Sequence, residues 1–298
     1  MSIPMSQFQA WMKSTQVEFE IALAHLLPAS TRLPTRLHEA MRYAALDGGK
    51  RVRPLLVFAA GRLFDAPISL LTRAAAALEM IHAYSLVHDD MPCMDDDALR
   101  RGKPTVHVKY DEATALLVGD ALQAQAFLVL AEGDASAECK LSMLQLLARA
   151  AGSTGMCGGQ AIDLASVGLA LKLDELEQMH RLKTGALLSA SVLMGAMSGK
   201  ALSDTEVSAL DAYSNAIGLA FQVVDDVLDA TADSATLGKT AGKDAVDNKP
   251  TYVSLLGLEA SCALAEKLCH DAHQALLPFG EKAQLLRDLA DLIVQRKA

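Results

Sequence analysis

Two clusters of aspartates that follow apolar stretches constrain this chain more than any other feature. The first cluster holds five aspartates between residues 89 and 97, and the second reads Asp225-Asp226-Val227-Leu228-Asp229. Carboxylates are seldom buried without a partner, so a cation must compensate both clusters. Carboxylate oxygens, completed by phosphate oxygens and water, are the ligands that Mg²⁺ prefers. We therefore expect two acidic walls that face one diphosphate.

The composition predicts one large all-α domain over residues 1–298. The 298 residues are 51% hydrophobic and 21% charged, which supports a sizeable core. Only 4% are aromatic and only 9 are proline, whereas strands favour aromatic and β-branched residues. The apolar periodicity predicts helices at residues 8–27, 37–46, 55–64, 70–88, 114–131, 137–151, 186–197, 207–229, 253–273 and 283–294.

The charge and hydropathy of the chain limit the kinds of partner that it can bind. A formal charge of −9 argues against a nucleic-acid partner, which would need a continuous basic face. The first residues lack the basic region and apolar core of a signal peptide, and the long apolar runs are interrupted. We therefore expect a soluble, cytoplasmic protein without stable membrane insertion.

The cysteines predict no disulfide framework. There are five, an odd number, and none forms a Cys-x-x-Cys pair. Cys262, Cys269, His270 and His273 are near one another in sequence, but their Ala- and Leu-rich stretch offers no fourth ligand at a standard zinc spacing. The sequence therefore does not predict a zinc site there.

A first group of cations follows a flexible glycine pair. Gly48 and Gly49 precede Lys50 and Arg53, which are three residues apart and can point at one anion. A solvated helix start is the alternative. His82 precedes Asp89 by two helical turns and so lies on nearly the same helix face, where it can donate to a phosphate.

The first aspartate cluster is interrupted and then followed by arginines. Asp89 and Asp95 would lie on different faces of a regular helix, but Pro92 disrupts the turn and lets both point inward. Arg100 and Arg101 lie in the loop that follows, and their planar donors suit phosphate oxygens. Neutralisation of the neighbouring aspartates is the alternative.

The second half of the chain supplies the opposite wall. Asp225 and Asp229 are one turn apart on an apolar helix, so they share a face as paired metal ligands require. Lys183 and Thr184 enter an apolar run, where a charge usually has a partner. The polar stretch 231–250, which contains Lys239 and Lys249, predicts a lid, with a surface insertion as the alternative.

Taken together, these motifs resemble the short-chain trans-polyprenyl diphosphate synthases, and most closely the bacterial farnesyl type. The match covers nearly the whole chain. It rests on Gly48-Gly49-Lys50-Arg51-Val52-Arg53-Pro54, the Asp89–Asp95 motif with Arg100-Arg101-Gly102, Gly158-Gly159-Gln160, Lys183-Thr184, residues 221–229 and Leu237-Gly238-Lys239.

The resemblance implies an all-α bundle around a deep central cavity, a homodimer, and Mg²⁺ as cofactor with three ions per site. It implies that the metal ligands are Asp89, Asp95 and Asp225, supported by Asp90 and Asp229. The cations implied to bind the allylic diphosphate are Arg100, Lys183 and Lys239. Lys249 is a second lid lysine that can bind substrate, and the residues implied to bind isopentenyl diphosphate are Lys50, Arg53, His82 and Arg101. Catalytic dipoles at the allylic cation would come from Lys183, Thr184 and Gln222.

The resemblance also implies how product length is set. Tyr84 and Ser85 occupy the positions five and four residues before the first aspartate, where bulky residues close the cavity in this family. One ring there, and the extended spacing between Asp90 and Asp95, predict farnesyl diphosphate as the main product. The alternatives are a geranylgeranyl diphosphate synthase, a class I terpene cyclase and a silent subunit of a synthase pair.

Overall fold

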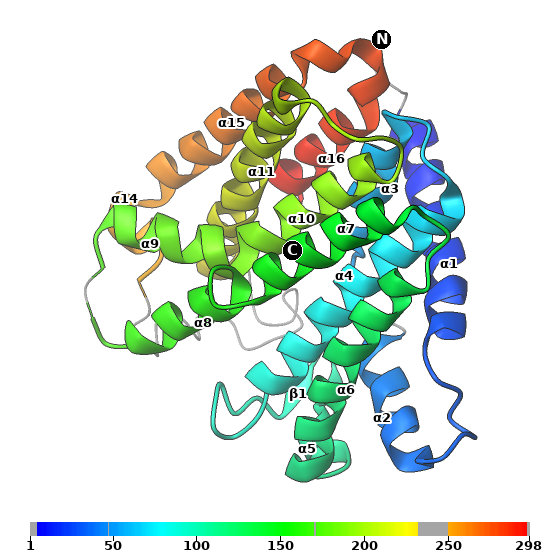
Figure 1. Ribbon diagram of the computed structural model, residues 1–298. Coiled ribbons are helices and arrows are strands. Elements are labelled where there is room, and N and C mark those ends of the chain that lie inside the picture. The colour runs from blue at the N-terminus through cyan, green and yellow to red at the C-terminus, as the bar shows by residue number, and fades with distance from the viewer. Residues whose placement is uncertain (1–4, 47, 170, 232–249, 297–298) are drawn as a thin grey trace.

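The computed structural model describes residues 5–46, 48–169, 171–231 and 250–296 (Figure 1). The predicted all-α class is confirmed, because the only strands among these residues are a pair of two-residue segments. The first half comprises α1 (Met5–Leu26), α2 (Thr35–Ala45), α3 (Val52–Arg62), α4 (Ile68–Asp89), β1 (Leu99–Arg100), β2 (Lys103–Pro104), α5 (Val106–Lys109), α6 (Glu112–Ala131) and α7 (Ala137–Ala151). The second half comprises α8 (Met156–Ala165), α9 (Leu173–His180), η1 (Arg181–Gly185), α10 (Ala186–Met197), α11 (Asp204–Thr231), α14 (Tyr252–Leu256), α15 (Leu258–Ala275), η2 (Leu277–Ala283) and α16 (Gln284–Gln295).

Helix α4 is the centre of the bundle. Its side chains are buried on every face over most of its length, since apolar residues surround the whole helix rather than one stripe. Helices α1, α2, α3, α6, α7 and α10 contact it, and Figure 1 shows it passing through the middle of the molecule. The run Ala74–Ala77 is fully buried, and these small side chains let the surrounding helices approach closely. Asp89, the last residue of α4, is thereby fixed by the core.

A second group of helices faces α4 across the site. Helix α11 packs against α10, α15 and α16, and α10 also packs against α3, which joins the two groups. Gly195 makes the α10–α3 contact possible, because a Cβ there would overlap the backbone of Val57. Asp225 on α11 is therefore held on a frame that is tied to α4.

The amphipathic patterning located the long helices, but it did not predict the shorter helices α5, α8 and α9, and it missed one break. The helix expected at 253–273 is two helices, α14 and α15, which Gly257 separates at a φ of 84°. The expected loop at Arg100 contains the short β1–β2 pair, in which Arg100 lies opposite Lys103. The expected lid at 231–250 lies almost wholly outside the described residues, which resume at Pro250.

Helix α6 is the one described helix that is long and apolar enough to cross a membrane. In the structure it packs along α4, and Ala115, Val118, Leu122 and Ala126 are completely buried on its inner face. Packing in the core thus accounts for much of its apolar composition.

A buried ion-pair network anchors the loop before α3. Arg51 is 6% exposed and adopts left-handed backbone geometry with a φ of 52°. Its guanidinium donates to Glu79 on α4 at 2.6 Å, to Glu20 on α1 at 2.7 Å and to the Ala45 carbonyl at 2.8 Å. The partners compensate the buried charge and fix the start of α3, where Arg53 lies.

Removing one partner of this network should be costly. We expect Arg51→Met to lower the free energy of unfolding by about 3 to 5 kcal/mol, because the Glu79 carboxylate would stay buried without its cation. Urea unfolding followed by circular dichroism measures the effect. The exposed Arg62→Met at the end of α3 is the matched control, with an expected change within about 0.5 kcal/mol. Equal losses in both variants would contradict a structural role for the Arg51 network.

Candidate active site

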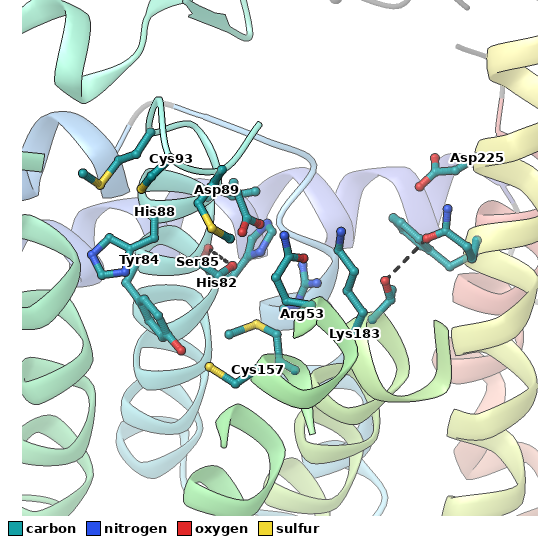
Figure 2. A pocket seen from close by; sticks show the side chains of 18 of the residues that line it. Arg53, His82, Tyr84, Ser85, His88, Asp89, Cys93, Cys157, Lys183 and Asp225 are labelled. Carbon is teal, nitrogen blue, oxygen red and sulfur yellow. Dashed lines mark hydrogen bonds between the residues drawn. The ribbon is translucent and has the colours of Figure 1, made fainter. Parts of the chain in front are cut away.

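A cavity of about 450 Å³, here called the main cavity, opens between α4 and α11. Figure 2 shows Asp89 and Asp225 on opposite sides of it, with Arg53 and Lys183 between them. Its lining consists of Arg53, His82, Tyr84, Ser85, Leu86, His88, Asp89, Met91, Cys93, Met94, Leu116, Met156, Cys157, Gln160, Lys183, Thr184, Phe221, Gln222 and Asp225. Away from the mouth the cavity lining is mostly apolar, whereas the mouth carries charged side chains. This distribution suits an amphipathic ligand with an anionic head.

Asp89 forms the first acidic wall at the C-terminal end of α4. The Asp95 amide donates to the Asp89 carbonyl at 2.8 Å, so the turn around Pro92 folds back and brings the two aspartates together. Burial raises the pKa of the Asp89 carboxyl to about 6; nearby Lys183 opposes this rise, and Asp95 adds to it. A bound cation would relieve this excess of negative charge.

Asp225 forms the second wall, and the end of the chain contacts it. Arg296, just after α16, donates to Asp225 Oδ1 at 2.7 Å and to the Phe221 carbonyl at 2.6 Å. Its guanidinium also stacks on the Phe221 ring, 3.9 Å from the centroid. Asp229 follows Asp225 by one turn on the same face of α11, but it is not part of the cavity lining. Asp225 is thus held by a cation that must yield if a metal takes the same oxygen.

Asp90 and Arg100 bind each other outside the main cavity. Asp90 is 3% exposed, and Arg100 donates to both of its carboxylate oxygens at 2.5 to 2.8 Å. Neither side chain lines the main cavity; both line a smaller neighbouring pocket. In this state the pair ties the β1–β2 segment to the end of α4.

Lys183 and Thr184 project into the main cavity from η1, a π-helical turn. Lys183 Nζ lies 2.5 Å from Asp163 Oδ2 on α8, a contact that orients the ammonium toward the mouth. Gly159 lets α8 approach this turn, because a Cβ there would overlap the Lys183 backbone. The sequence motif Gly-Gly-Gln-x-x-Asp therefore serves the position of Lys183.

A short polar chain positions Gln222. The Gln222 Nε2 donates to Asp226 Oδ1 at 3.0 Å, which leaves Oε1 directed at Thr184 Oγ1, 3.5 Å away. Asp226 is 5% exposed and also accepts from the Tyr252 amide at 2.8 Å. Asp226 is absent from the cavity lining, and it fixes the orientation of the Gln222 amide.

A second pocket of about 510 Å³, here called the basic pocket, adjoins the main cavity and shares Arg53, His82 and Phe221 with it. Lys50 and Arg101 also line it. Arg53 and Arg101 form no ion pair with any residue that the structure describes. The pocket thus concentrates positive charge that an anionic ligand would neutralise.

The glycine pair before Lys50 makes room for Arg101. A Cβ at Gly48 would lie 2.5 Å from Arg101 Nη1, and one at Gly49 would lie 2.7 Å from Nη2. Gly49 also has a φ of 83°, which favours glycine. The Gly-Gly-Lys motif therefore places Lys50 and Arg101 on the same pocket.

His82 lies where the two pockets meet. Burial lowers the pKa of its imidazole well below the usual value, and the nearby guanidiniums of Arg53 and Arg101 lower it further. The ring is therefore neutral at pH 7, so its role is hydrogen bonding rather than charge.

Tyr84 and Ser85 lie deeper in the main cavity. The Tyr84 ring is 5% exposed and packs edge-on against His88, with 5.8 Å between centroids. Burial raises the pKa of its phenol to about 12, and Figure 2 shows the hydroxyl near Cys157. The Ser85 hydroxyl donates to the His82 carbonyl at 2.9 Å. Tyr84 is therefore placed to limit the depth of the cavity.

Nine of the seventeen predicted site residues line the main cavity, Lys50 and Arg101 line the basic pocket, and Asp90 and Arg100 line the smaller neighbouring pocket. Lys239 and Lys249 lie outside the described residues. Sequence reasoning assigned no role to Asp163, Asp226 or Arg296, because each acts through another side chain: Lys183 for Asp163, Gln222 on the same helix for Asp226, and Asp225 for Arg296. Only the spacing of Asp163 from Gln160 was a signal.

The donors at the mouth fit Mg²⁺. Asp89, Asp95 and Asp225 offer oxygen ligands, and a bound cation would offset the burial that raises the pKa of Asp89. Cys93 is exposed at the rim, and the other polar side chains of the lining belong to Arg53, Lys183, two histidines, two glutamines, Tyr84, Ser85 and Thr184.

Comparisons with known proteins all indicate one family. The polyprenyl synthetase family model matches residues 34–285. A probable farnesyl diphosphate synthase of Sinorhizobium fredii is 52% identical over 284 residues, covering 94% of this chain and 86% of the relative. The farnesyl diphosphate synthase of Escherichia coli is 50% identical over 268 residues, covering 88% of this chain and 90% of the relative.

Solved structures agree. An FPP/GFPP synthase from Zymomonas mobilis superposes with a TM-score of 0.87 at 42% identity and covers 97% of this chain and 99% of its own. A geranyltransferase from Helicobacter pylori, complexed with magnesium and isoprenyl diphosphate, superposes with a TM-score of 0.84 at 32% identity, covering 98% and 97% of the two chains.

The histidine before the π turn predicts an acid-sensitive fold. His180 is buried against the Tyr252 ring, and burial lowers its pKa from 6.5 to about 4. Between pH 6.5 and pH 4 the histidine is protonated in the unfolded chain but stays neutral in the folded chain. The free energy of unfolding therefore falls as pH falls from 6.5 to 4, by about 3 kcal/mol in total. His180→Gln should flatten the pH dependence of the urea midpoint in that window, whereas the exposed His25→Gln should not. Identical slopes for wild type and His180→Gln would contradict the assignment.

Proposed function

Because the chain belongs to the polyprenyl synthetase family, we propose that it condenses isopentenyl diphosphate with dimethylallyl and then geranyl diphosphate to give farnesyl diphosphate. It is a prenyltransferase. The observation that carries the proposal is the pair of adjoining pockets. One has acidic walls and an apolar floor, and the other collects cations, so two diphosphates can lie side by side with their hydrocarbon ends in contact.

The acidic walls account for the allylic substrate. Asp89, Asp95 and Asp225, supported by Asp90 and Asp229, would hold three Mg²⁺ ions against the allylic diphosphate; when bound, the ions stabilise the negative charge that develops on the leaving diphosphate. Magnesium use is supported by the Helicobacter pylori geranyltransferase complex. Lys183, held by Asp163, points an ammonium at the same mouth. Arg100 would reach this diphosphate only by leaving Asp90.

The neutral dipoles account for the carbocation. Thr184 Oγ, Gln222 Oε1 and the Lys183 carbonyl offer partial negative charge without a strong nucleophile, and Asp226 keeps the amide oxygen turned toward Thr184. The apolar lining below them excludes water, which would otherwise quench the cation. The basic pocket holds isopentenyl diphosphate through Lys50, Arg53, His82 and Arg101. The new carbon–carbon bond forms between the allylic carbocation and isopentenyl diphosphate. The diphosphate released from the allylic substrate accepts the proton that is then lost.

One experiment tests the reaction against its alternatives. The purified protein is incubated with isopentenyl and dimethylallyl diphosphates, with and without Mg²⁺, and the dephosphorylated products are separated by chromatography. We expect farnesol as the main product, formed only with the metal. A cyclic hydrocarbon would indicate a terpene cyclase, no product a silent subunit, and geranylgeraniol a longer-chain synthase.

We also propose that the enzyme is a soluble cytoplasmic homodimer. Helix α6 exposes Leu117 and Leu128 at 54% and 48%, so one apolar row faces outward while the opposite face packs on α4. Such a row is best covered by a second copy of the chain. The free cysteines fit a reducing compartment.

The two walls should both be essential. We expect Asp89→Asn and Asp225→Asn each to lower kcat at least about 1,000-fold, because each neutralises a direct metal ligand while preserving side-chain shape. Steady-state assays at saturating Mg²⁺ measure the loss, and circular dichroism checks the fold. Asp120→Asn, an exposed aspartate on α6, is the control. A loss below tenfold in either wall variant would exclude that residue as a ligand.

Tyr84 should set product length. Tyr84→Ala removes the ring that closes the main cavity beside His88, so we expect the product to shift from farnesyl toward geranylgeranyl diphosphate or longer. Tyr84→Phe keeps the ring and should keep farnesyl. Chromatography of the products decides, and a folded Tyr84→Ala enzyme that still stops at farnesyl would show that another residue forms the floor.

The outward row of α6 should form the dimer interface. Leu117→Glu combined with Leu128→Glu should convert the dimer to a monomer in sedimentation equilibrium, because two buried unpaired charges oppose association. Val17→Glu on α1, where the valine is 54% exposed, is the matched control and should leave the dimer intact. A double variant that remains dimeric would place the interface elsewhere.

A further inference from the structure

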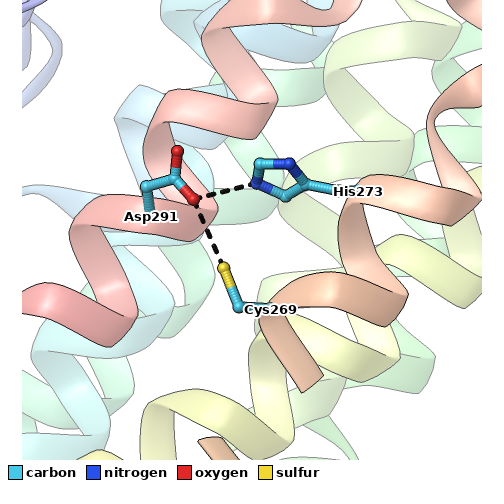
Figure 3. A group of neighbouring side chains, drawn as sticks. All are labelled: Cys269, His273 and Asp291. Atoms are coloured by element: carbon cyan, nitrogen blue, oxygen red, sulfur yellow. Dashed lines mark hydrogen bonds and ion pairs between the residues drawn. The ribbon is translucent and has the colours of Figure 1, made fainter. Parts of the chain in front are cut away.

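A second group of potential metal ligands lies on the last two helices, outside the main cavity. Cys269 and His273 are one turn apart on α15, and Asp291 on α16 faces both of them (Figure 3). These three residues offer a thiol, an imidazole and a carboxylate at one point. None of them lines the main cavity or the basic pocket.

The ligand atoms lie near enough to share one ion, although the His273–Asp291 distance is shorter than the spacing of ligands around zinc. Cys269 Sγ lies 3.4 Å from Asp291 Oδ1, His273 Nε2 lies 2.9 Å from the same oxygen, and the three ligand atoms are all within 4.8 Å of one another. Around a tetrahedral zinc ion with bonds of about 2.0 to 2.3 Å, neighbouring ligand atoms are about 3.3 to 3.7 Å apart. Small side-chain rotations would bring all three to this geometry.

Unsatisfied polar atoms adjoin the same point. His273 Nε2 is shielded from solvent and makes no hydrogen bond, although Asp291 Oδ1 is 2.9 Å away, because the ring nitrogen does not point at that oxygen. Asp288 Oδ2, one turn before Asp291, is also shielded without a hydrogen-bond partner. A simple ion pair would align the N–H with the carboxylate, whereas ligands of one ion all point to a shared centre.

We propose that Cys269, His273 and Asp291 bind one zinc ion. A thiolate with an imidazole and a carboxylate favours zinc, whereas the oxygen ligands of the main cavity favour Mg²⁺. Binding releases the thiol proton to solvent as the zinc–sulfur bond forms, and no electron is transferred. Burial and the neighbouring Asp291 raise the pKa of the free thiol to about 12, so the ion must displace that proton.

The ion would cross-link α15 to α16. His273 and Asp291 have side-chain exposures of 32% and 41%, which leaves a path from solvent. Helix α16 leads directly to Arg296, which holds Asp225. The zinc site is therefore structural, and it supports the helix that ends at the second acidic wall.

Cobalt titration of the full-length, metal-stripped protein tests this site. In millimolar Mg²⁺, one equivalent of Co²⁺ should produce a thiolate-to-cobalt charge-transfer band together with the intense visible bands of a tetrahedral ion, and Zn²⁺ should bleach both. Oxygen-ligated cobalt at the main cavity gives neither signal. Zn²⁺ should also raise the unfolding temperature of the wild type.

Two variants remove a proposed zinc ligand, and two others are controls. Cys269→Ser should remove the charge-transfer band, and His273→Gln should weaken Zn²⁺ binding at least about 100-fold in competition with a chromophoric chelator. Cys262→Ser on the same helix and Cys93→Ser at the rim of the main cavity should behave as wild type. The proposal is overturned if the wild type shows no thiolate band, or if the band survives Cys269→Ser; the three residues are then an ion pair with a neighbouring thiol.

Discussion

A charged group can remain inside a helical bundle only if other charges or polar groups compensate it, and this requirement organises the whole structure. Some charges are paired within the protein: Arg51 with Glu79, Arg100 with Asp90 and Lys183 with Asp163. Other charged groups are placed where a ligand would compensate them. Asp89 carries an elevated pKa, and Arg53 and Arg101 have no ion-pair partner among the described residues. The groups that lack compensation all line the main cavity or the basic pocket, whereas paired charges occur both in the scaffold, as at Arg51, and at the site, as at Lys183.

The paired charges also explain how distant segments keep one geometry. Arg51 links α1, α4 and the start of α3, so the loop that carries Lys50 is tied to the central helix. Arg296 links the end of α16 to α11 through Asp225 and the Phe221 ring. Each link joins a wall of the site to a helix far away in sequence, and a prenyl transfer that needs both diphosphates in register benefits from walls that do not drift.

Sequence reasoning reached the fold class, the long helices and most residues at the mouth, because these depend on local patterns. Apolar periodicity located α7 and α10 at their observed bounds, and the acidic motifs identified Asp89 and Asp225. It merged α14 with α15, since one glycine in a helical pattern is a weak signal until its φ is known. It did not predict β1–β2 or the Arg296–Asp225 contact, because pairings across the fold leave no mark in spacing.

The same limit explains why the sequence did not predict a metal site around Cys269. Cys269 and His273 alone lacked further ligands, and Asp291 reaches them only when α16 folds back along α15. A ligand set divided between two helices cannot be recognised from either helix alone.

The π turn at η1 has a consequence for how this chain can change over time. A π turn holds one residue more than an α turn, so deleting one residue from Arg181–Gly185 would let the segment close as a regular α turn and would shift Lys183 and Thr184 relative to the cavity. The buried residues of α10 would keep their packing on α3 and α11. A point substitution in this turn alters one side chain, whereas a change of length moves both cavity residues together. The length of this segment should therefore be nearly invariant even where its sequence varies.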